Sequence, residues 1–549
     1  MPHNFGTMTK GYGSVSPDLV VDEKDPLVGS SKRSKQAWKQ WAVFSIVIGI
    51  LVAWFAPQSD ETFVPNEDDD YDGPVFPTTI ERYYEHQTFD HFTSRRGDPR
   101  HWRQHYFEDN DFFQGPGSPI FLIVGGEGAI HRILYPYISR HLGKRFGAHT
   151  VCLEHRFYGS SQPTLTPTNE DLRRLLHPRQ AIADALKFLQ YKRRELGCGP
   201  KGTPEYCPVM TIGGSYPGFL AALLRIDHPE AVDIGYASSA PLHLYSHDVD
   251  PGSYFEKITD VAEANAPGCA AAVKQTLMAM QNILQTVSME DMDEIASDLG
   301  ICPASVPDYI QDMDTFRREL NTVVATHFAE ANMGFYPPSS DTELVQSCRI
   351  FQERFTSAAN KIAKVLLLRQ GFEGCFDLTT ELPPGPNGTI SASDWSGVGG
   401  GYAGLIWDFQ SCTLIPQCGM SDESMFPPRP WTLEWLTQHC QDRFGYTPVQ
   451  DALKKEFRFD DLSNVTRMLF TNGINDGWSI ASITDNVSES VLAVNMVNGA
   501  HHSDLSHTGP SDSDTDDVKA AHVVIGNLVE QWLDEVYVET QGQPPVRKI

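Results

Sequence analysis

Basic residues are scarce in this sequence. Its 549 residues include 43 Lys and Arg against 71 Asp and Glu, which gives a formal net charge of −28 at pH 7. So acidic a chain is repelled by phosphate backbones, which excludes nucleic acid as an expected partner. The same balance suits the acidic lumen of an endolysosome or vacuole, where carboxylates are partly protonated, and it suits secreted proteins equally well.

Cysteine is absent from the N-terminal quarter of the sequence. All ten cysteines lie between Cys152 and Cys440, and none has the close paired spacing of a zinc ribbon. We therefore predict no metal site and no cofactor, and we expect disulfides in an oxidising compartment. Cys198 and Cys207 are predicted to pair across a Gly- and Pro-rich loop. Cys152 lies in an apparent buried strand and is expected to be free.

Long apolar runs are scarce as well, and the clearest one is Trp41–Ala56. As a helix that rises ~1.5 Å per residue it would span about 24 Å, short of a hydrocarbon core of about 30 Å. We predict a single transmembrane signal anchor at residues 41–57. A cleaved signal peptide is the alternative, but the forty residues that precede the run are too long for its n-region.

The charges on either side of this run predict its orientation. Residues 1–40 show no periodicity and end in a cluster of four basic residues, whereas seven acidic residues and no basic one lie between Asp60 and Asp72. The positive-inside rule therefore makes residues 1–40 a cytosolic tail and puts the bulk of the chain in the lumen or outside the cell, a type II topology. Residues 58–80, acidic and proline-bearing, are predicted to form a stalk. Three glycosylation sequons lie on the lumenal side, at Asn387, Asn464 and Asn486.

The most informative motif is a serine at the apex of a predicted sharp turn. The apolar run Val209–Ile212 predicts a strand, Gly213–Gly218 a turn, and the residues that follow a helix. Such a turn holds the Ser215 hydroxyl clear of the backbone and lets the amide of Tyr216 donate to a developing oxyanion. The match to the pattern G-x-S-x-G is imperfect because Pro217 stands where the last glycine belongs, so a plain Gly-Ser loop is the alternative.

Two further turns supply partners for a nucleophilic serine. Arg467–Phe470 predicts a short buried strand that leads to Asp476, and Val491–Met496 predicts the next strand, which leads to His501 and His502. The chain order Ser, Asp, His, each just past a strand, is that of α/β-hydrolases, in which all three meet at one edge of the sheet. His501 would act as the base, and Asp476 would fix its tautomer. The alternatives are ordinary turn chemistry for Asp476 and a structural pair for the histidines.

Seven segments together resemble one family of serine peptidases. They are Gln87–Phe92, Gly125–Gly128, Glu154–Ser160, Gly214–Ala222, Ser238–Pro241, Asn472–Trp478 and Gly499–Asp504. On these segments the chain, from about Glu85 to its C-terminus, is identified as a member of the family that includes lysosomal prolyl carboxypeptidase, dipeptidyl peptidase II and thymus-specific serine protease. The resemblance implies Ser215 as nucleophile, Asp476 as acid and His501 as base, with His502 as a neighbour of the base.

The chain departs from the family pattern at four places. Gly125–Gly128 reads Gly-Gly-Glu-Gly, as in the thymus-specific branch, whereas the two proline-directed enzymes tend to carry Asn before Glu. Pro217 replaces a glycine in the first turn of the predicted helix, where proline is tolerated. Gly477 stands where the family usually has proline. Leu414 stands where relatives often have an acid, which leaves the recognition of a peptide terminus open.

The glycine loop that follows the predicted strand Ser118–Val124 is expected to complete the oxyanion site. A backbone amide near Gly126 would be the second donor beside that of Tyr216. Glu127 and Glu154 are candidates for binding a substrate amine. The alternative is that they accept hydrogen bonds from backbone amides, with Arg156 pairing with one of them.

Strand signals cluster in residues 118–240 and return only at about Arg467. This pattern predicts an α/β-hydrolase core, residues 81–245 and 430–549, that is interrupted by a mainly helical cap at residues 246–429. Helical stretches are predicted at Ala270–Leu299, Asp314–Ala331, Leu344–Leu368 and, packing on the core, Asp516–Tyr537. A Gly- and Pro-rich segment is expected before Pro430.

A cap over the strand ends would restrict the site to short or extended peptides. Trp407, Phe409 and Trp478 are candidate walls of the pocket for the residue before the cut, with plain aromatic core as the alternative. The sequence therefore predicts a serine-type peptidase that works through an acyl-enzyme, an exopeptidase that prefers proline or a small apolar residue before the cut. An esterase or acyltransferase with the same triad, or a binding ectodomain without catalysis, are the alternatives.

The expected partners are peptide or protein substrates and, through one N-terminal helix, a membrane. The expected location of the catalytic part is endolysosomal, vacuolar or the cell surface. Monomer and homodimer stay open as alternatives.

Overall fold

The computed structural model describes residues 79–93, 98–307, 310–380, 401–429, 431–505 and 511–541. The chain divides into two units, Met1–Tyr71 and Asp72–Ile549, and every described residue belongs to the second. The predicted tail, membrane anchor and nearly all of the stalk lie outside the described residues, as does the sequon at Asn387. Within the described part of the chain, no helix has the length and apolar character that crossing a bilayer requires.

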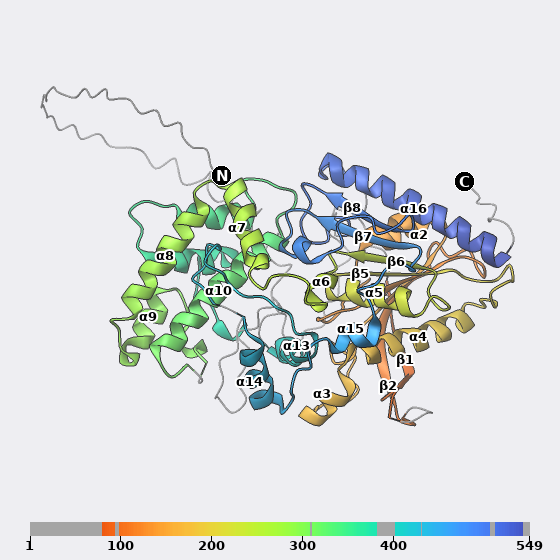
Figure 1. Cartoon of the computed structure of the whole chain (residues 1–549), viewed down its shortest axis with the longest axis horizontal. Coiled ribbons are helices and arrows are strands. Elements are labelled where there is room, and N and C mark those ends of the chain that lie inside the picture. Colours follow the sequence, from red (N-terminus) through yellow and green to blue (C-terminus); the bar gives the residue numbers. More distant parts are fainter. Residues whose placement is uncertain are drawn as a thin grey trace, which may run out of the picture. The chain divides into compact units, whose positions relative to one another are not determined.

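Eight strands form one mixed sheet in the order β1-β2-β4-β3-β5-β6-β7-β8 (Figure 1). Their bounds are Ile80–Thr88, His101–Asp109, Ile120–Val124, His149–Leu153, Val209–Gly214, Ile234–Ser238, Met468–Gly473 and Val491–Met496, for β1 to β8. Strand β2 runs antiparallel to both of its neighbours, and the other pairs are parallel. This is the strand order of an α/β-hydrolase sheet, so the predicted fold of the core is confirmed.

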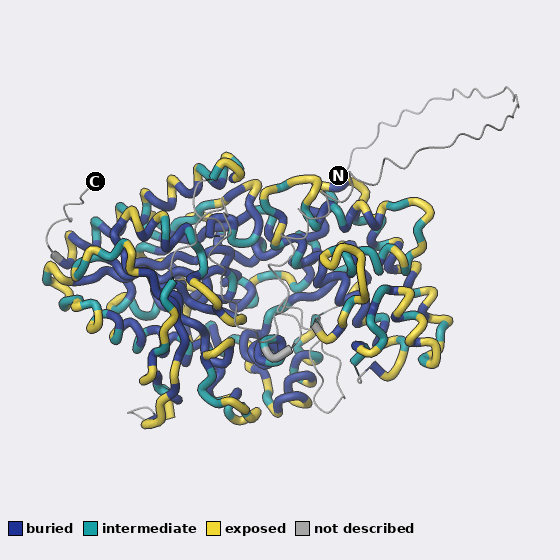
Figure 2. The backbone as a smooth tube through the Cα atoms, turned by 180° about the vertical axis from the view of Figure 1, so that it is seen from behind, coloured by how far each residue is buried: buried dark blue, intermediate teal, exposed yellow. Residues whose placement is uncertain are grey.

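Helices cover both faces of the sheet. The first, third and fifth side chains of β3 belong to the core formed with α4 (Pro178–Glu195) and α5 (Tyr216–Asp227), whereas Phe121 and Ile123 belong to the core under α16 (Asp516–Gln541). All five are buried, which is why β3 is an uninterrupted apolar run in the sequence. Much of the backbone in the interior of this unit is buried, as the dark blue parts of the tube in Figure 2 show. Three short helices precede α4: η1 (Tyr137–Leu142), α2 (Gly143–Phe146) and α3 (Asn169–Leu175).

Strands β1 and β2 are not among the strands that the sequence predicts, because its strand signals begin only at residue 118. Both carry charged and aromatic residues in place of an apolar run. Their polar side chains are satisfied by distant parts of the chain: the carboxylate of Glu108 in β2 accepts a hydrogen bond from Lys192 of α4 at 2.5 Å. A local pattern cannot reveal such a partner.

The chain between β6 and β7 is rich in helices. They are α6 (Leu242–Tyr245), α7 (Ser253–Asn265), α8 (Cys269–Leu284), α9 (Met292–Asp298), α10 (Met313–Met333), α11 (Glu343–Phe351), α12 (Ala358–Leu366), α13 (Gly401–Leu414), α14 (Leu433–Phe444) and α15 (Ala452–Phe457). The division of this insertion from the core at residues 246 and 429 stays a prediction.

Three details of the insertion differ from the sequence analysis. The stretch Ala270–Leu299 is divided into α8 and α9, and the stretch Leu344–Leu368 into α11 and α12. The second break has a local cause, because the Ser357 side chain accepts a hydrogen bond from the amide of Asn360 at 3.2 Å and so starts a new helix. The segment expected to be only Gly- and Pro-rich contains α13. By contrast, the predicted stretch Asp314–Ala331 is the single helix α10.

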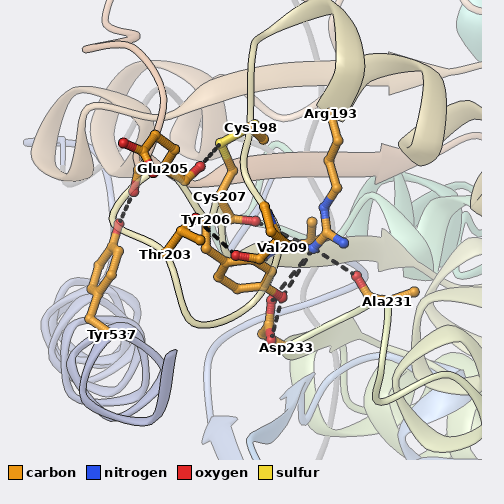
Figure 3. Close-up of a disulfide and its surroundings, with 12 residues drawn as sticks. Arg193, Cys198, Thr203, Glu205, Tyr206, Cys207, Val209, Ala231, Asp233 and Tyr537 are labelled. Carbon is orange, nitrogen blue, oxygen red and sulfur yellow. Dashed lines mark hydrogen bonds and ion pairs between the residues drawn. A yellow bond between two sulfur atoms is a disulfide. The ribbon is translucent and has the colours of Figure 1, made fainter. Parts of the chain in front are cut away.

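Four disulfides link cysteines of the second unit. They are Cys198–Cys207, Cys269–Cys348, Cys302–Cys375 and Cys412–Cys440. The predicted pair Cys198–Cys207 is confirmed; it closes the loop before β5, beside the Tyr206 hydroxyl that donates to Asp233 at 2.9 Å (Figure 3). Cys152 is a free, buried thiol, as predicted; Cys418 is buried as well and takes no part in these four disulfides.

Candidate active site

Ser215 lies at a strained turn between β5 and α5. Its backbone has φ 58° and ψ −131°, a conformation that residues other than glycine rarely adopt. Glycines around it allow the tight turn: a Cβ on Gly213 would lie 2.1 Å from the carbonyl oxygen of Pro217, and one on Gly218 would lie 2.9 Å from Ala240. The strand, turn and helix predicted around Ser215 are therefore all present.

Pro217, the departure from the glycine pattern, packs against the glycine loop after β3. A Cβ on Gly126 would lie only 2.3 Å from Cγ of the Pro217 ring. Proline is tolerated in this first turn of α5 because its missing N–H has no helical partner there. The contact holds the Gly125–Gly128 loop beside the turn that carries Ser215. The contact therefore brings the loop that contains Gly126, the predicted second oxyanion donor, next to the serine turn.

Asp476 and His501 are joined by a hydrogen bond. The Nδ1 atom of His501 lies 2.6 Å from Oδ2 of Asp476, whose side chain is fully buried. The other carboxylate oxygen accepts the backbone N–H of Trp478 at 3.0 Å. The two loops are also tied together through the amide of Asn475, which donates to the carbonyl of Gly499 at 2.9 Å. The pair predicted from two separate motifs is therefore in contact.

Ser215, Asp476 and His501 all follow strands that run parallel in the sheet, β5, β7 and β8, so they lie at the same edge (Figure 1). His502 brings the histidine loop onto the serine turn, since a Cβ on Gly214 would lie 2.5 Å from its Nε2. Burial, and then the nearby His501, holds the pKa of His502 well below its ordinary value. His502 is therefore a neutral packing residue beside His501, whose ring centroid is 3.8 Å away.

Asp504 anchors the loop that carries His501. Its buried carboxylate accepts hydrogen bonds from the hydroxyls of Tyr236, Ser238 and Thr471 at 2.6, 2.7 and 2.6 Å. These donors belong to β6 and β7, which separate β5 from β8 in the sheet. Asp504 lies in one of the family-like segments, but its role could not be predicted from the sequence because the three donors are distant in the chain.

The loop of Asp476 is held by helices of the insertion. Asn332 of α10 accepts the N–H of Gly477 and donates to the carbonyl of Asn475, both at 2.8 Å. A Cβ on Gly477 would lie 2.6 Å from the ring of Tyr254 in α7, on which Trp478 stacks with ring centroids 4.0 Å apart. Glycine in place of the usual proline thus leaves room for this ring and provides a donor.

Trp407 of α13 lies next to the residue that follows Ser215. Its ring meets that of Tyr216 edge to face, with centroids 5.3 Å apart. Trp407 is only 4% exposed, and its indole nitrogen has no hydrogen-bond partner among the described residues. Phe409, by contrast, packs edge to face on Phe444 of α14 in a separate core, so the hypothesis that it lines the pocket is wrong. Leu414 is fully buried and presents no group to a peptide terminus.

Glu127 is a half-buried carboxyl of the glycine loop. Burial raises its pKa to about 7, and the charge of His501 acts in the opposite direction. Glu127 therefore lies close enough to His501 to sense its charge.

Glu154 and Arg156 have structural partners. Glu154 accepts a hydrogen bond from the backbone N–H of Ile130 at 3.0 Å and so supports the chain directly after the glycine loop. The alternative in which Arg156 pairs with Glu127 or Glu154 is wrong. Its guanidinium binds both carboxylate oxygens of Asp184 in α4, at 2.6 and 2.7 Å. A fully buried guanidinium is stabilised by such a bidentate ion pair with a carboxylate. The sequence does not reveal which carboxylate this is.

Two of the three predicted glycosylation sites are described. Asn464 and Asn486 are both exposed, as a glycan requires. The Oδ1 atom of Asn486 accepts the N–H of Ala493 at 2.8 Å. This contact leaves the side-chain nitrogen available for the glycosidic bond.

Comparison with known proteins places the chain in a family. A family model described as Serine carboxypeptidase S28 matches residues 87–525. Lysosomal Pro-X carboxypeptidase of Bos taurus is 26% identical over 481 residues, 84% of this chain and 90% of that protein. Thymus-specific serine protease of Mus musculus is 25% identical over 464 residues, 80% of this chain and 85% of that protein.

Solved structures are similar over a smaller part. The acylaminoacyl peptidase of Pyrococcus horikoshii matches 32% of this chain and 25% of its own, with a TM-score of 0.24 and 13% identity, a likeness too slight to bear on the site. The family model, in contrast, spans most of the chain, including the three turns that carry Ser215, Asp476 and His501. The chain belongs to the serine carboxypeptidase S28 family and is a serine hydrolase.

Proposed function

We propose that this protein is a serine exopeptidase with Ser215 as nucleophile, His501 as general base and Asp476 as the acid that orients the base. The observation that carries the proposal is the 2.6 Å hydrogen bond between His501 Nδ1 and Asp476 Oδ2, at the sheet edge where the strained turn presents Ser215. A carboxylate can only accept, so Nδ1 carries the proton in the neutral ring. This leaves Nε2 of His501 as the acceptor for the serine proton.

The reaction follows from these positions. Oγ of Ser215 attacks the scissile carbonyl carbon and passes its proton to Nε2 of His501. The amides of Tyr216 and of the loop at Gly126 donate to the resulting oxyanion. When the C–N bond breaks, His501 returns the proton to the leaving amine, and an acyl-enzyme remains on Ser215. Water then attacks the ester by the same steps, which releases the acid and the free serine.

The specificity that we propose is cleavage after proline or a small apolar residue. Relatives named Pro-X carboxypeptidase support it. Trp407 and Trp478 would form walls of the pocket for that residue. The indole N–H of Trp407, which has no partner in the described part of the chain, would be a donor for the peptide. Glu127 would contact the polar end of the substrate.

We further propose that the catalytic unit lies in the lumen of an endolysosomal compartment and is anchored by residues 41–57. Four disulfides and the exposed sequons at Asn464 and Asn486 suit such a compartment. Relatives carry the word lysosomal in their names. Protease treatment of intact vesicles should then leave the unit whole, while alkaline carbonate washing should leave it in the membrane fraction.

The test of the catalytic proposal uses the full-length protein in detergent. The wild type should react with a fluorophosphonate probe and digest a peptide library, and Ser215→Ala should do neither. The cut positions in the library identify the end from which the enzyme works and the residue it prefers. Peptide cleavage that persists in Ser215→Ala would refute the assignment of the nucleophile.

A further inference from the structure

A line of buried hydrogen bonds connects the insertion to the serine turn. The hydroxyl of Tyr158 donates to Oε1 of Gln410, and Nε2 of Gln410 donates to the hydroxyl oxygen of Tyr216 at 2.9 Å. That hydroxyl lies 3.2 Å from Nε2 of His155, whose Nδ1 lies 2.7 Å from the carbonyl oxygen of Arg156. None of these residues is more than 4% exposed. Tyr216, which follows Ser215, is at the centre of the line.

The direction of every bond in this line is determined. A carbonyl oxygen only accepts, so Nδ1 of His155 carries the hydrogen and Nε2 is the acceptor. Burial lowers the pKa of His155 to about 4, which keeps the ring neutral. The Tyr216 hydroxyl must therefore donate to His155, and its oxygen must accept from the amide of Gln410. Only a side chain that both donates and accepts can stand between Tyr158 and Tyr216.

Gln410 projects from a helix that is firmly attached on its other side. Helix α13 is joined to α14 by the disulfide Cys412–Cys440. Asp408, two residues before Gln410, binds His439 of α14 at 2.6 Å and lies 2.5 Å from the guanidinium of Arg443. The helix that presents Gln410 to Tyr216 is therefore fixed by a covalent bond and by two buried contacts of the Asp408 carboxylate.

We propose that Gln410 is a positioning residue for acyl transfer: through its bond to the Tyr216 hydroxyl, α13 of the insertion fixes the residue whose amide stabilises the oxyanion. The inference rests on the proposed function and deepens it. Tyr216 is held at its hydroxyl by Gln410 and His155, and at its ring by Trp407. Its backbone N–H belongs to the strained turn, where a small shift changes the aim of the donor. The insertion thus affects the acyl-transfer step as well as the access of substrate to the site.

Gln410→Met tests this inference, because it keeps the length of the side chain and removes both polar atoms. We expect kcat to fall by about 10-fold, less than the loss of a whole oxyanion donor, with KM changed by less than about twofold. The matched control is Ser411→Ala, which removes a hydroxyl that donates to the carbonyl of Trp407 in the same helix. This control should keep the wild-type kcat.

Tyr216→Phe removes the other end of the same bond and does not depend on whether Gln410→Met folds well. It should lower kcat by a similar factor. In the double variant the two effects should not multiply, because each single change has already broken the bond between the two residues. Effects that multiply in the double variant would overturn the inference.

Gln410→Glu distinguishes positioning from simple filling of space. The carboxylate cannot donate to Tyr216, whereas the protonated acid restores one donor and one acceptor. The titratable groups around residue 410 are Tyr158, Tyr216 and His155. Glu127 also acts there, because its charge affects the Tyr216 hydroxyl. We expect kcat relative to the wild type at the same pH to be low at pH 8 and to rise as pH falls toward 5, since burial raises the pKa of a carboxyl above its ordinary value of about 4.3.

The outcomes separate the two proposals. A wild type that does not react with the fluorophosphonate probe would refute the catalytic triad. A wild type that reacts, together with Gln410→Met and Tyr216→Phe variants that keep its kcat, would refute the role of Gln410 and leave the triad intact. A rise in KM with kcat unchanged would also refute it, because that pattern indicates a residue that binds substrate.

Discussion

The hydroxyl of Ser238, at the end of β6, donates to the carboxylate of Asp504 at 2.7 Å, and this contact ties the histidine loop to the centre of the sheet. Two more hydroxyls, of Tyr236 and Thr471, donate to the same carboxylate. Three buried donors that share one acceptor depend on it together. If Asp504 is lost, the three hydroxyls lose their common acceptor, and His501 loses the support of its loop.

Asp504→Asn should therefore reduce both stability and turnover. An amide offers one acceptor oxygen and turns an N–H toward a hydroxyl, so we expect the free energy of unfolding to fall by about 3 kcal/mol, with a lower kcat. Denaturant titration and steady-state kinetics measure the two effects. Asp512→Asn, an exposed change in the same segment, is the control. A variant as stable as the wild type would show that the three hydroxyls find other acceptors.

The contact between Gly126 and Pro217 predicts a pair of compensating changes. In Gly126→Ala the new methyl group would meet the proline ring at 2.3 Å and push the glycine loop away from Ser215, so kcat should fall by about 100-fold. Pro217→Gly removes the ring and restores the G-x-S-x-G pattern. The double variant should recover most of the lost kcat. No recovery would mean that the loop is displaced for another reason.

Gly477→Pro introduces the residue that the family usually has, and here it should be harmful. Proline cannot donate to Asn332, and its ring would enter the space of Tyr254. We expect the free energy of unfolding to fall by about 2 kcal/mol, and kcat to fall because Asp476 is displaced. Gly477→Ala keeps the N–H and adds only the Cβ, so the difference between the two variants measures the lost hydrogen bond together with the rest of the proline ring. Equal stability of Gly477→Pro and the wild type would contradict this account.

The residues of the proposed triad could be predicted because each one lies in a short motif directly after a strand. The chemistry of the turn at Ser215 is local, and so is the turn that contains Asp476. The order of the strands then brings the motifs to one edge of the sheet, as parallel strands must. The fold of the core is predictable for the same reason, since its central strands are continuous apolar runs.

The supports of the site could not be predicted, because they depend on contacts across the insertion. Gln410 and Tyr216 are 194 residues apart in the sequence, and Asn332 and Gly477 are 145 apart. Glutamine in a helix and asparagine near a helix end are common in any protein. Only packing brings them to Tyr216 and to the Asp476 loop. The same holds for Arg156, whose partner Asp184 lies on a helix with no special pattern.

The carboxyl of Glu127 predicts a change in activity near neutral pH. Burial raises its pKa to about 7, so it is neutral below that pH and negative above it, beside His501. A negative charge there favours the imidazolium that forms in the transition state, which should assist the wild type only above pH 7. Glu127→Gln resembles the neutral form at every pH. Its kcat/KM relative to the wild type should therefore be near one at pH 5 and fall by about threefold by pH 8.5.

The substrate for this comparison is a peptide with a blocked N-terminus, so that no amine binds Glu127 directly. The control is Glu205→Gln, which removes an exposed carboxylate in the Cys198–Cys207 loop, before β5. Its ratio to the wild type should stay constant from pH 5 to pH 8.5. If the Glu127→Gln ratio is equally constant, Glu127 does not act on His501. If the Glu127→Gln ratio rises with pH, the negative charge of Glu127 slows catalysis. That result would contradict the prediction that this charge favours the imidazolium of His501.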